Sequence, residues 1–200
     1  YFQGTFGAYS HIAALEFEPN AKIIPCKTFD ECFLKASLES DSKIVIPESN
    51  RITGNIGIEY LIFKYRLNIY AEHFLKIEHN LLGQPGSKIS DIKNVFSHAQ
   101  ALSQCSNFIK KNNLVEHIRA DTAGSAETIS HNKIKSEGAI ASSLSAKTYK
   151  LKILAPNVEN EVSNATRFLV MGKKISQPDF GNKKYITSFL FKLKSKPAAL

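Results

Sequence analysis

Apolar positions in the first part of the chain change repeatedly between the spacing of a helix and that of a strand. Apolar side chains at positions 9, 12, 13 and 17 follow the three- and four-residue spacing of a helix. Residues 22–25 are typical of a short strand, and the apolar run at 44–46 is typical of a buried strand. Between these runs, Thr28 and Glu31 have the spacing of a capping box, which predicts a helix that buries Phe29, Cys32, Phe33 and Ala36. This alternation is typical of a parallel sheet covered by helices.

A long extended segment leads into a second alternating series. A helical stretch near 56–64 precedes extended residues at 67–82, which end at the turn sequence Gly83-Gln84-Pro85-Gly86. Further strands are expected at 95–96, 114–120, 139–141, 152–154 and 168–171. A helix face is expected at Ala101, Cys105, Phe108 and Ile109, and Asp121 is placed to cap a later helix.

Two α/β series joined by crossovers near 67–82 and 164–173 predict a two-lobed, periplasmic-binding-protein-like α/β fold. In such folds the ligand lies in the cleft between the lobes, against the ends of strands and helices. We expect residues 1–75 and 170–180 to form the first lobe and residues 76–169 the second. Residues 176–181 are typical of a linker, and 185–200 are expected to begin a further domain with a new strand.

Charge and composition narrow the class of partner. The 200 residues are 43% hydrophobic, as in globular domains, and 26 Lys and Arg against 18 Asp and Glu give a net charge of +8. The densest basic groups, Lys110-Lys111 and Lys183-Lys184, lack the interleaved aromatic residues that stack on bases, so we expect no nucleic-acid partner. The positive field still favours anionic small molecules.

Neither a membrane nor a metal is expected. No apolar run approaches the roughly 20 residues that span a bilayer, and no signal-peptide pattern follows Tyr1, so a cytoplasmic protein is predicted. Cys26, Cys32 and Cys105 form no CxxC pair, which favours buried thiols in a reducing compartment. The six histidines show no metal-ligand spacing, so we expect no metal and no cofactor.

Three segments carry candidate chemistry. Gly4-Thr5-Phe6-Gly7-Ala8-Tyr9-Ser10 is a glycine turn into a helix whose first N–H groups are free to bind an anion. The second, Ser97-His98-Ala99-Gln100-Ala101-Leu102-Ser103-Gln104-Cys105, follows a strand; Ser-His adjacency without a G-x-S-x-G elbow does not indicate a hydrolase. The third, Asn164-Ala165-Thr166-Arg167-Phe168, begins the second crossover.

In this order, the three segments resemble the prephenate dehydratase family, the enzymes of phenylalanine synthesis, and Asn164 to Phe168 match its N-x-TRF motif. The resemblance covers almost the whole chain, because three further segments also match, namely Glu78-His79-Asn80-Leu81-Leu82, Asp121 to Ala126 and Gly138 to Ser142. It favours Tyr1 to Gly4 as a native strand end over a tag remnant. Thr187 to Leu200 resemble the opening of the phenylalanine-sensing ACT domain, an α+β regulatory domain.

One departure from the family concerns its pattern Pro-x-Glu-Asn-Ser-x-x-Gly. Aligned through Pro47 and Gly54, the chain keeps Asn50 but has Ser49 at the Glu position and Arg51 at the Ser position. The nearest carboxylate, Glu48, is displaced by one residue. Adjacent residues on a regular strand point to opposite faces, so the role of a carboxylate here stays open.

The resemblance implies loss of CO2 and water from prephenate to give phenylpyruvate. It implies that Thr166 donates to the leaving hydroxyl, and that Asn50, Ser97, Gln104 and Thr122 are neutral donors that orient substrate. Ser10 and the N–H groups of its helix would take a carboxylate. Arg167 would either bind an anion or form a structural ion pair.

Two alternatives stay open at this point. Arogenate dehydratase acts on a substrate that differs by one amino group, and a noncatalytic two-lobed binding module would share the architecture. The resemblance to an ACT domain further implies phenylalanine as an effector and a homodimer or homotetramer.

Overall fold

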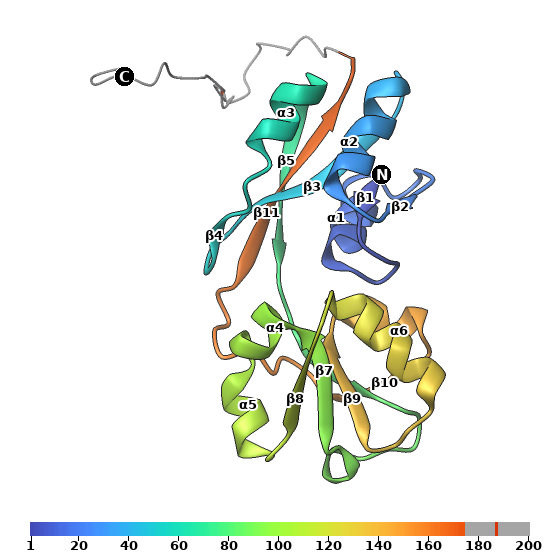
Figure 1. The fold of residues 1–200 in the computed structure, drawn as a ribbon, viewed down its shortest axis with the longest axis vertical. Helices are drawn as coiled ribbons and strands as arrows, with labels where there is room; N and C mark the ends of the chain where they lie inside the picture. Colours follow the sequence, from blue (N-terminus) through green and yellow to red (C-terminus); the bar gives the residue numbers. More distant parts are fainter. Residues whose placement is uncertain (175–186, 188–200) are drawn as a thin grey trace, which may run out of the picture.

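Two β-sheets, each covered by helices, form two lobes stacked along the long axis of the protein (Figure 1). The computed structural model describes residues 1–174 and Thr187. The two-lobed α/β fold expected from the sequence is confirmed. The rest of 175–200, including nearly all of the expected start of an ACT domain, lies outside the described residues.

The first sheet has the strand order β2-β1-β3-β11-β5, and β4 pairs with β3. Its strands are β1 (Phe2–Gln3), β2 (Pro25–Cys26), β3 (Lys43–Asn50), β4 (Gly54–Asn55), β5 (Asn68–Lys76) and β11 (Ala165–Gly172). β1 is parallel to both its neighbours, whereas β11 is antiparallel to β3 and to β5. The helices of this lobe are α1 (Tyr9–Phe17), α2 (Phe29–Leu38) and α3 (Glu59–Tyr65).

The second sheet has the order β10-β6-β9-β7-β8. Its strands are β6 (Asn80–Gly83), β7 (Asn94–His98), β8 (Val115–Arg119), β9 (Glu137–Ala141) and β10 (Lys152–Ala155). β7 is parallel to β8 and β9, as in βαβ units. The helical elements are η1 (Ile89–Asp91), α4 (Ala99–Gln104), α5 (Ser106–Lys111), α6 (Thr122–Asn132) and α7 (Ser143–Thr148).

The expected helix caps are present. The Thr28 hydroxyl accepts the N–H of Glu31 (3.1 Å), and the Asp121 carboxylate accepts the N–H of Gly124 (2.6 Å). The helix expected across 101–109 is instead divided into α4 and α5 at Cys105. The Cys105 N–H bonds the Leu102 carbonyl in a tighter turn, and this turn places the Cys105 side chain in the core.

The boundary between the lobes differs from the expected one. Residues 165–169, expected in the second lobe, belong to β11 of the first sheet, where Ala165 pairs with Lys76. The Ile77 N–H also donates to the Asn164 carbonyl (2.9 Å), so the two crossovers, 77–79 and 156–164, are joined where they leave the first sheet. β11 begins directly after the crossover because it lies between β3 and β5 and pairs with both strands.

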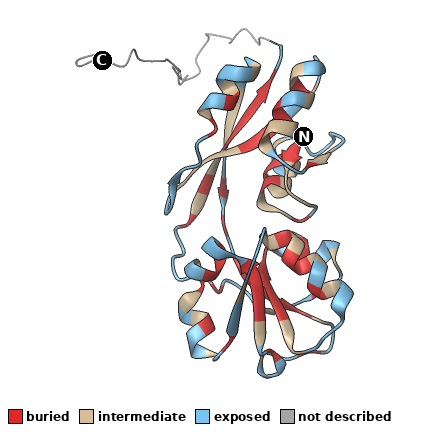
Figure 2. Cartoon of the chain, in the orientation of Figure 1, coloured by how far each residue is buried: buried red, intermediate tan, exposed pale blue. Residues whose placement is uncertain are grey.

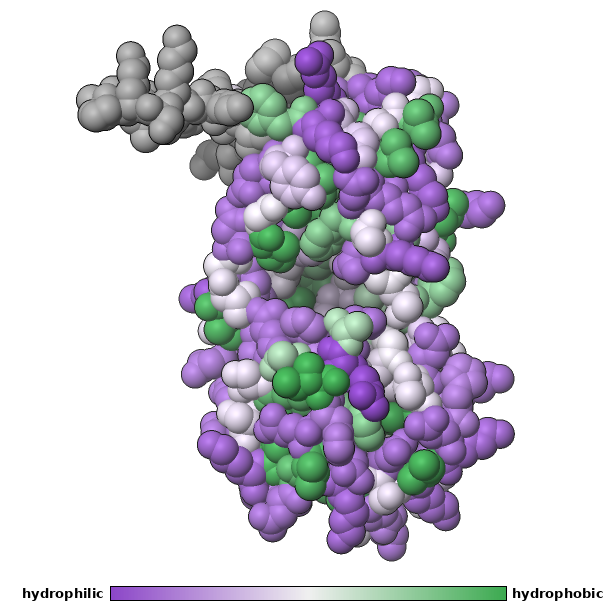
Figure 3. Space-filling model, in the orientation of Figure 1, coloured by the Kyte–Doolittle hydropathy of each residue, from purple (hydrophilic) through white to green (hydrophobic). Residues whose placement is uncertain are grey.

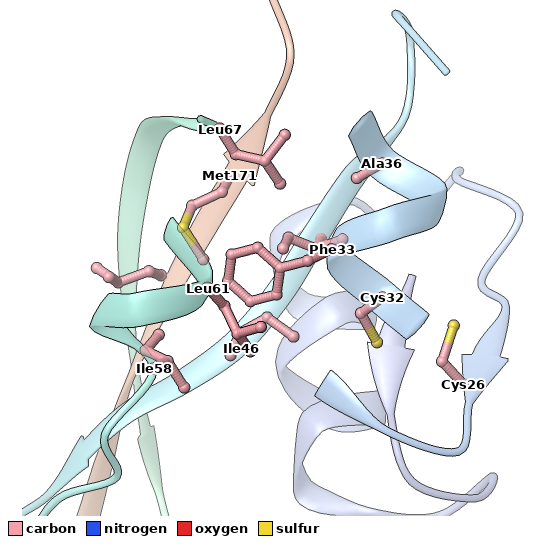
Figure 4. Packing of buried hydrophobic residues seen from close by; sticks show 11 residues of the cluster. Cys26, Cys32, Phe33, Ala36, Ile46, Ile58, Leu61, Leu67 and Met171 are labelled. Carbon is pink, nitrogen blue, oxygen red and sulfur yellow. The ribbon is translucent and has the colours of Figure 1, made fainter. Parts of the chain in front are cut away.

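Helices cover both faces of the first sheet, and buried residues lie along the sheets (Figure 2). Leu169 and Met171 of β11 pack toward α2 and α3, around the fully buried Phe33 (Figure 4). Phe168 and Val170, the alternate residues, pack toward α1. β11 therefore contributes to both cores of this lobe.

The three cysteines are buried as free thiols, as expected. Burial raises the pKa of Cys105 to about 12, so its thiol is uncharged at neutral pH. In the described part of the chain, no helix is long and apolar enough to cross a membrane.

The core around Phe33 gives a direct test of this packing. We expect Phe33→Ala to lower the free energy of unfolding by about 3–5 kcal/mol, because it leaves a cavity among α2, α3 and the sheet. Leu38→Ala, on the same helix but 72% exposed, should change it by less than about 0.5 kcal/mol. Urea unfolding of both variants measures the difference, and equal losses would contradict the assignment of this core.

Candidate active site

Polar side chains from β3 and β11 meet at the end of the first sheet that faces the crossovers. Thr166 lies opposite Asn50 in the β11–β3 register and is 7% exposed. The Asn50 amide nitrogen donates to the Thr166 hydroxyl oxygen (2.9 Å) and to the side-chain oxygen of Asn164 (2.8 Å). The predicted catalytic residue and one predicted binding residue are therefore in direct contact.

A β-bulge at Glu48 makes this contact possible. Along β11, Arg167 pairs with Ser49 and the next residue, Phe168, pairs with Pro47, so Glu48 has no partner. The extra residue shifts the alternation of β3, which turns Asn50 to the same face as Thr166. Without the bulge, regular alternation from Val45 would have placed Asn50 on the opposite face.

The bulge also answers the question of the displaced carboxylate. Glu48 and Ser49 share the face of Arg167, and the Ser49 hydroxyl donates to the Glu48 carboxylate (2.6 Å). The Arg167 guanidinium bonds Glu48 (3.2 Å) and, more closely, Glu72 of β5 (2.7 Å). Arg167 thus forms ion pairs with both carboxylates on the face of β11 opposite Thr166.

A second group of polar side chains extends the cluster into the second lobe. Asn164 is fully buried, and its amide nitrogen donates to the side-chain oxygen of Gln104 at the end of α4 (3.1 Å). His79, 2% exposed in the first crossover, contacts the same oxygen through Nε2 (2.9 Å). Its Nδ1 contacts the Tyr9 hydroxyl (2.8 Å), and burial lowers the pKa of His79.

The remaining predicted residues lie apart from this hydrogen-bonded cluster. Ser97 is fully buried, and its hydroxyl donates to the Ile140 carbonyl of β9 (2.6 Å). The hydroxyl hydrogen is therefore already used in a bond within the second sheet. Ser10 is buried in the first turn of α1, and Thr122 is the first residue of α6. Among the described residues, neither hydroxyl has a hydrogen-bond partner.

The glycine turn forms the other contact between the lobes. The hydroxyls of Ser142 and Ser145, at the start of α7, both donate to the Gly7 carbonyl, and Tyr149 donates to the Phe6 carbonyl (2.8 Å). Gly7 has φ +93°, and a Cβ on it would lie 2.6 Å from the Ser145 hydroxyl oxygen. The turn needs glycine both for its conformation and for this close approach.

The surface is hollowed between the two lobes (Figure 3). Two cavities lie beside the crossovers, one next to each. One, about 360 Å³, is lined by Tyr9, Leu75 and Ser142, and the other, about 160 Å³, by Gln104, Asn164 and Ile52. The chain of contacts from Tyr9 through His79 and Gln104 to Asn164 joins the two cavities. Within residues 1–174, no three His, Cys, Asp or Glu side chains gather as metal ligands would.

The site residues predicted from the sequence did not include His79, Asn164 or Tyr9. All three lie inside motifs that the sequence analysis quoted, so the signal was present. Their polar character did not show that His79 and Asn164 would be buried, or that Tyr9 would contact His79. The bonds that hold them join positions far apart in sequence, 114 residues in the case of Asn50 and Asn164.

Two sheets, two joined crossovers and a polar cluster between the lobes define a protein of the two-lobed, periplasmic-binding-protein-like class. A structure from Arthrobacter aurescens, described as prephenate dehydratase in complex with L-Phe, has this fold with a TM-score of 0.81 at 23% identity, covering 89% of this chain and 61% of that one. The model of the family "Prephenate dehydratase" matches residues 1–176. The chain belongs to the prephenate dehydratase family.

Sequence relatives agree with this assignment. "Arogenate dehydratase/prephenate dehydratase 1, chloroplastic" from Arabidopsis thaliana is 43% identical over 202 residues, covering 100% of this chain and 51% of the relative. "Bifunctional N-acyl-homoserine lactone acylase/prephenate dehydratase" from Komagataeibacter europaeus is 32% identical over 200 residues, covering 100% and 71%. The chain spans about half the length of the plant relatives it matches.

The contact at Gly7 predicts a difference between two glycine substitutions. We expect Gly7→Ala to separate the lobes, because the added Cβ would also lie 2.8 Å from the Ser145 Cα, which is backbone. Gly57→Ala is the matched control, since Gly57 has a similar φ of +81° but open space around it. Both variants carry backbone strain of about 1–2 kcal/mol.

Small-angle scattering of the full-length variants measures the separation. Gly7→Ala should have the larger radius of gyration and the lower melting temperature of the two. Identical values for both variants would show that the glycine turn does not hold the lobes together.

Proposed function

We propose that this protein converts prephenate to phenylpyruvate. In this reaction the bond between the ring and its carboxylate breaks to release CO2. The electron pair enters the ring as it becomes aromatic, and the ring hydroxyl leaves as hydroxide, which a proton converts to water. The protein has to bind two carboxylates and donate a hydrogen bond to the departing oxygen.

The observation that carries the proposal is the state of the Thr166 hydroxyl. Its oxygen accepts a hydrogen from the Asn50 amide, so one lone pair is occupied. Its own hydrogen has no acceptor among residues 1–174 and is therefore available to a ligand. An oriented neutral donor suits a departing hydroxide, because its hydrogen bond strengthens as negative charge develops on the leaving oxygen.

Other residues have supporting roles in the proposal. Gln104 donates to the substrate through its amide nitrogen, while Asn50 orients Thr166. Ser10, the N–H groups at the start of α1, and Thr122 are proposed to bind the carboxylates from the two lobes. We assign Arg167 and Ser97 to the structure rather than to the substrate, because Glu72 and Glu48 hold the first and Ile140 holds the second.

Arogenate is the second candidate substrate. The relatives' printed names combine arogenate and prephenate dehydratase, and both substrates lose the same two groups. Acyl hydrolysis, part of the name of the Komagataeibacter relative, has less support: the Ser97 hydroxyl donates to Ile140, and His98 accepts the N–H of Gln100 (3.3 Å). Ser97 and His98 thus form no nucleophile–base pair.

Regulation and location belong to the same proposal. We propose phenylalanine as an effector, assembly as a homodimer or homotetramer, and a cytoplasmic location. The A. aurescens protein is described in complex with L-Phe, which supports the first. Light scattering of the full-length protein with and without phenylalanine tests effector and assembly together, and an unchanged monomer would contradict both.

Thr166→Val tests the catalytic role. The substitution keeps the β-branched shape in a strand and removes the hydroxyl, so kcat for prephenate should fall by about 100-fold or more with little change in KM. Gln104→Ala should instead raise KM at least as much as it lowers kcat, because its amide binds the substrate before reaction. Initial rates on prephenate and on arogenate measure both variants and give the substrate preference.

Serine at the same position is the control. Thr166→Ser retains the hydroxyl and should keep most of the activity, while both Thr166 variants should melt near the parent. Near-parental kcat in a normally folded Thr166→Val protein would exclude Thr166 as the donor. No turnover of either substrate by the parent would favour the noncatalytic binding module.

A further inference from the structure

We infer that His79 is a positioning residue: protonated on Nε2, it holds the Gln104 amide with its oxygen turned inward, so that the two amide hydrogens remain for the substrate. The inference deepens the proposed function and rests on it for the identity of the substrate. It rests on the structure alone for the orientation of the side chains.

Hydrogen bonds to the backbone fix which side-chain atom of Asn50 is the oxygen and which is the nitrogen. Its oxygen accepts the N–H groups of Ile52 (3.0 Å) and Thr53 (3.2 Å). The two hydrogens of its nitrogen are shared among three acceptors, which are the Ala165 carbonyl (3.2 Å) and the two side-chain oxygens already described. Exchanging the oxygen and nitrogen would set two carbonyl oxygens against each other and an NH2 group against two N–H donors. Backbone groups cannot exchange roles, so only one orientation is allowed.

This orientation passes along the chain of amides. Because the Asn50 nitrogen is the donor, the Asn164 atom that faces it is the oxygen (2.8 Å). The Asn164 nitrogen then faces Gln104, and the Gln104 atom that accepts it is again the oxygen (3.1 Å). Each amide has one acceptor and one donor end, so fixing the first fixes the other two.

The last member of the chain is a ring, and its proton is fixed by the same logic. His79 Nε2 lies 2.9 Å from the Gln104 oxygen, so this nitrogen carries a hydrogen. In the neutral ring Nδ1 is then an acceptor. The Tyr9 hydroxyl lies 2.8 Å from Nδ1 and 2.9 Å from the Glu78 carbonyl, so its one hydrogen is shared between these two acceptors. Burial lowers the pKa of His79, which favours this neutral form.

The consequence is that the amide chain places donors toward the ligand. The Gln104 oxygen receives two hydrogen bonds, from His79 and Asn164, whereas its nitrogen has no acceptor among residues 1–174. The Thr166 hydroxyl hydrogen likewise has no acceptor within this part of the chain. Carboxylate and hydroxyl oxygens are acceptors, so a substrate that presents them meets hydrogens at Gln104 and at Thr166. Without the His79 donor the Gln104 oxygen is held by the Asn164 amide alone, so the amide is less firmly oriented and its oxygen is more often presented to those anions.

The first test is spectroscopic and needs no activity. Long-range ¹H–¹⁵N spectra of the full-length protein with ¹⁵N-labelled histidine report which ring nitrogen carries the proton. We expect His79 to have a protonated Nε2 and an unprotonated Nδ1 near neutral pH. A ring protonated on Nδ1 alone would overturn the inference, whether or not the protein acts on prephenate.

The second test compares substitutions at His79. His79→Leu should raise KM for the active substrate by about tenfold or more, the weakening expected when a hydrogen bond to a carboxylate is lost, with a smaller fall in kcat. His79→Gln, whose amide nitrogen reaches the position of Nε2, should restore most of the affinity. Tyr9→Phe is the matched control, because it removes the partner of Nδ1 and leaves the Nε2–Gln104 bond in place.

These outcomes separate the inference from the proposed function. A protein with the expected His79 proton but no turnover would refute the dehydratase proposal and leave the orientation of Gln104 intact. An active enzyme whose KM is the same with His79, Leu or Gln, all folded, would refute the role of His79. A KM change in Tyr9→Phe as large as that in His79→Leu would assign the effect to the Tyr9 hydroxyl and refute the role of the Nε2 donor.

Discussion

The Asn50 amide is the interaction on which the rest of the site depends. It is anchored by backbone groups of the loop after β3 and of β11, and it bonds both Thr166 and Asn164. A neutral amide with a defined donor end and acceptor end transmits orientation without adding a charge to a buried place. The Asn50 side chain thereby joins the first lobe to the returning crossover, and Asn164 of that crossover bonds Gln104 of the second lobe.

The Arg167 ion pairs are separated from this cluster, whereas the Glu159 carboxylate contacts it by accepting the His79 backbone N–H (2.9 Å). The Arg167 guanidinium and its two carboxylate partners lie on the opposite face of β11. They are partly exposed there, so water solvates the charges that the ion pairs neutralise. The face of Thr166 carries hydroxyl and amide groups instead. A site of neutral donors stabilises charge that forms during a reaction without holding a countercharge in its ground state.

The lobes contact each other at two places of different character. The hinge side consists of the paired crossovers and the His79–Gln104–Asn164 cluster, whereas the other side is the Gly7 carbonyl held by two serines. The family relation and the geometry agree that ligand chemistry belongs between these two contacts.

The sequence by itself determined the α/β alternation, the caps at Thr28 and Asp121, the buried cysteines and the family motifs, because each depends on local spacing. It also identified Thr166, Asn50 and Gln104 as candidates. Only the tertiary structure decided that Glu48 bulges and turns Asn50 toward Thr166, that residues 165–169 join the first sheet, and that His79 and Asn164 complete the cluster. Those outcomes depend on the register between strands far apart in sequence, and a shift of one residue reverses which face a side chain occupies.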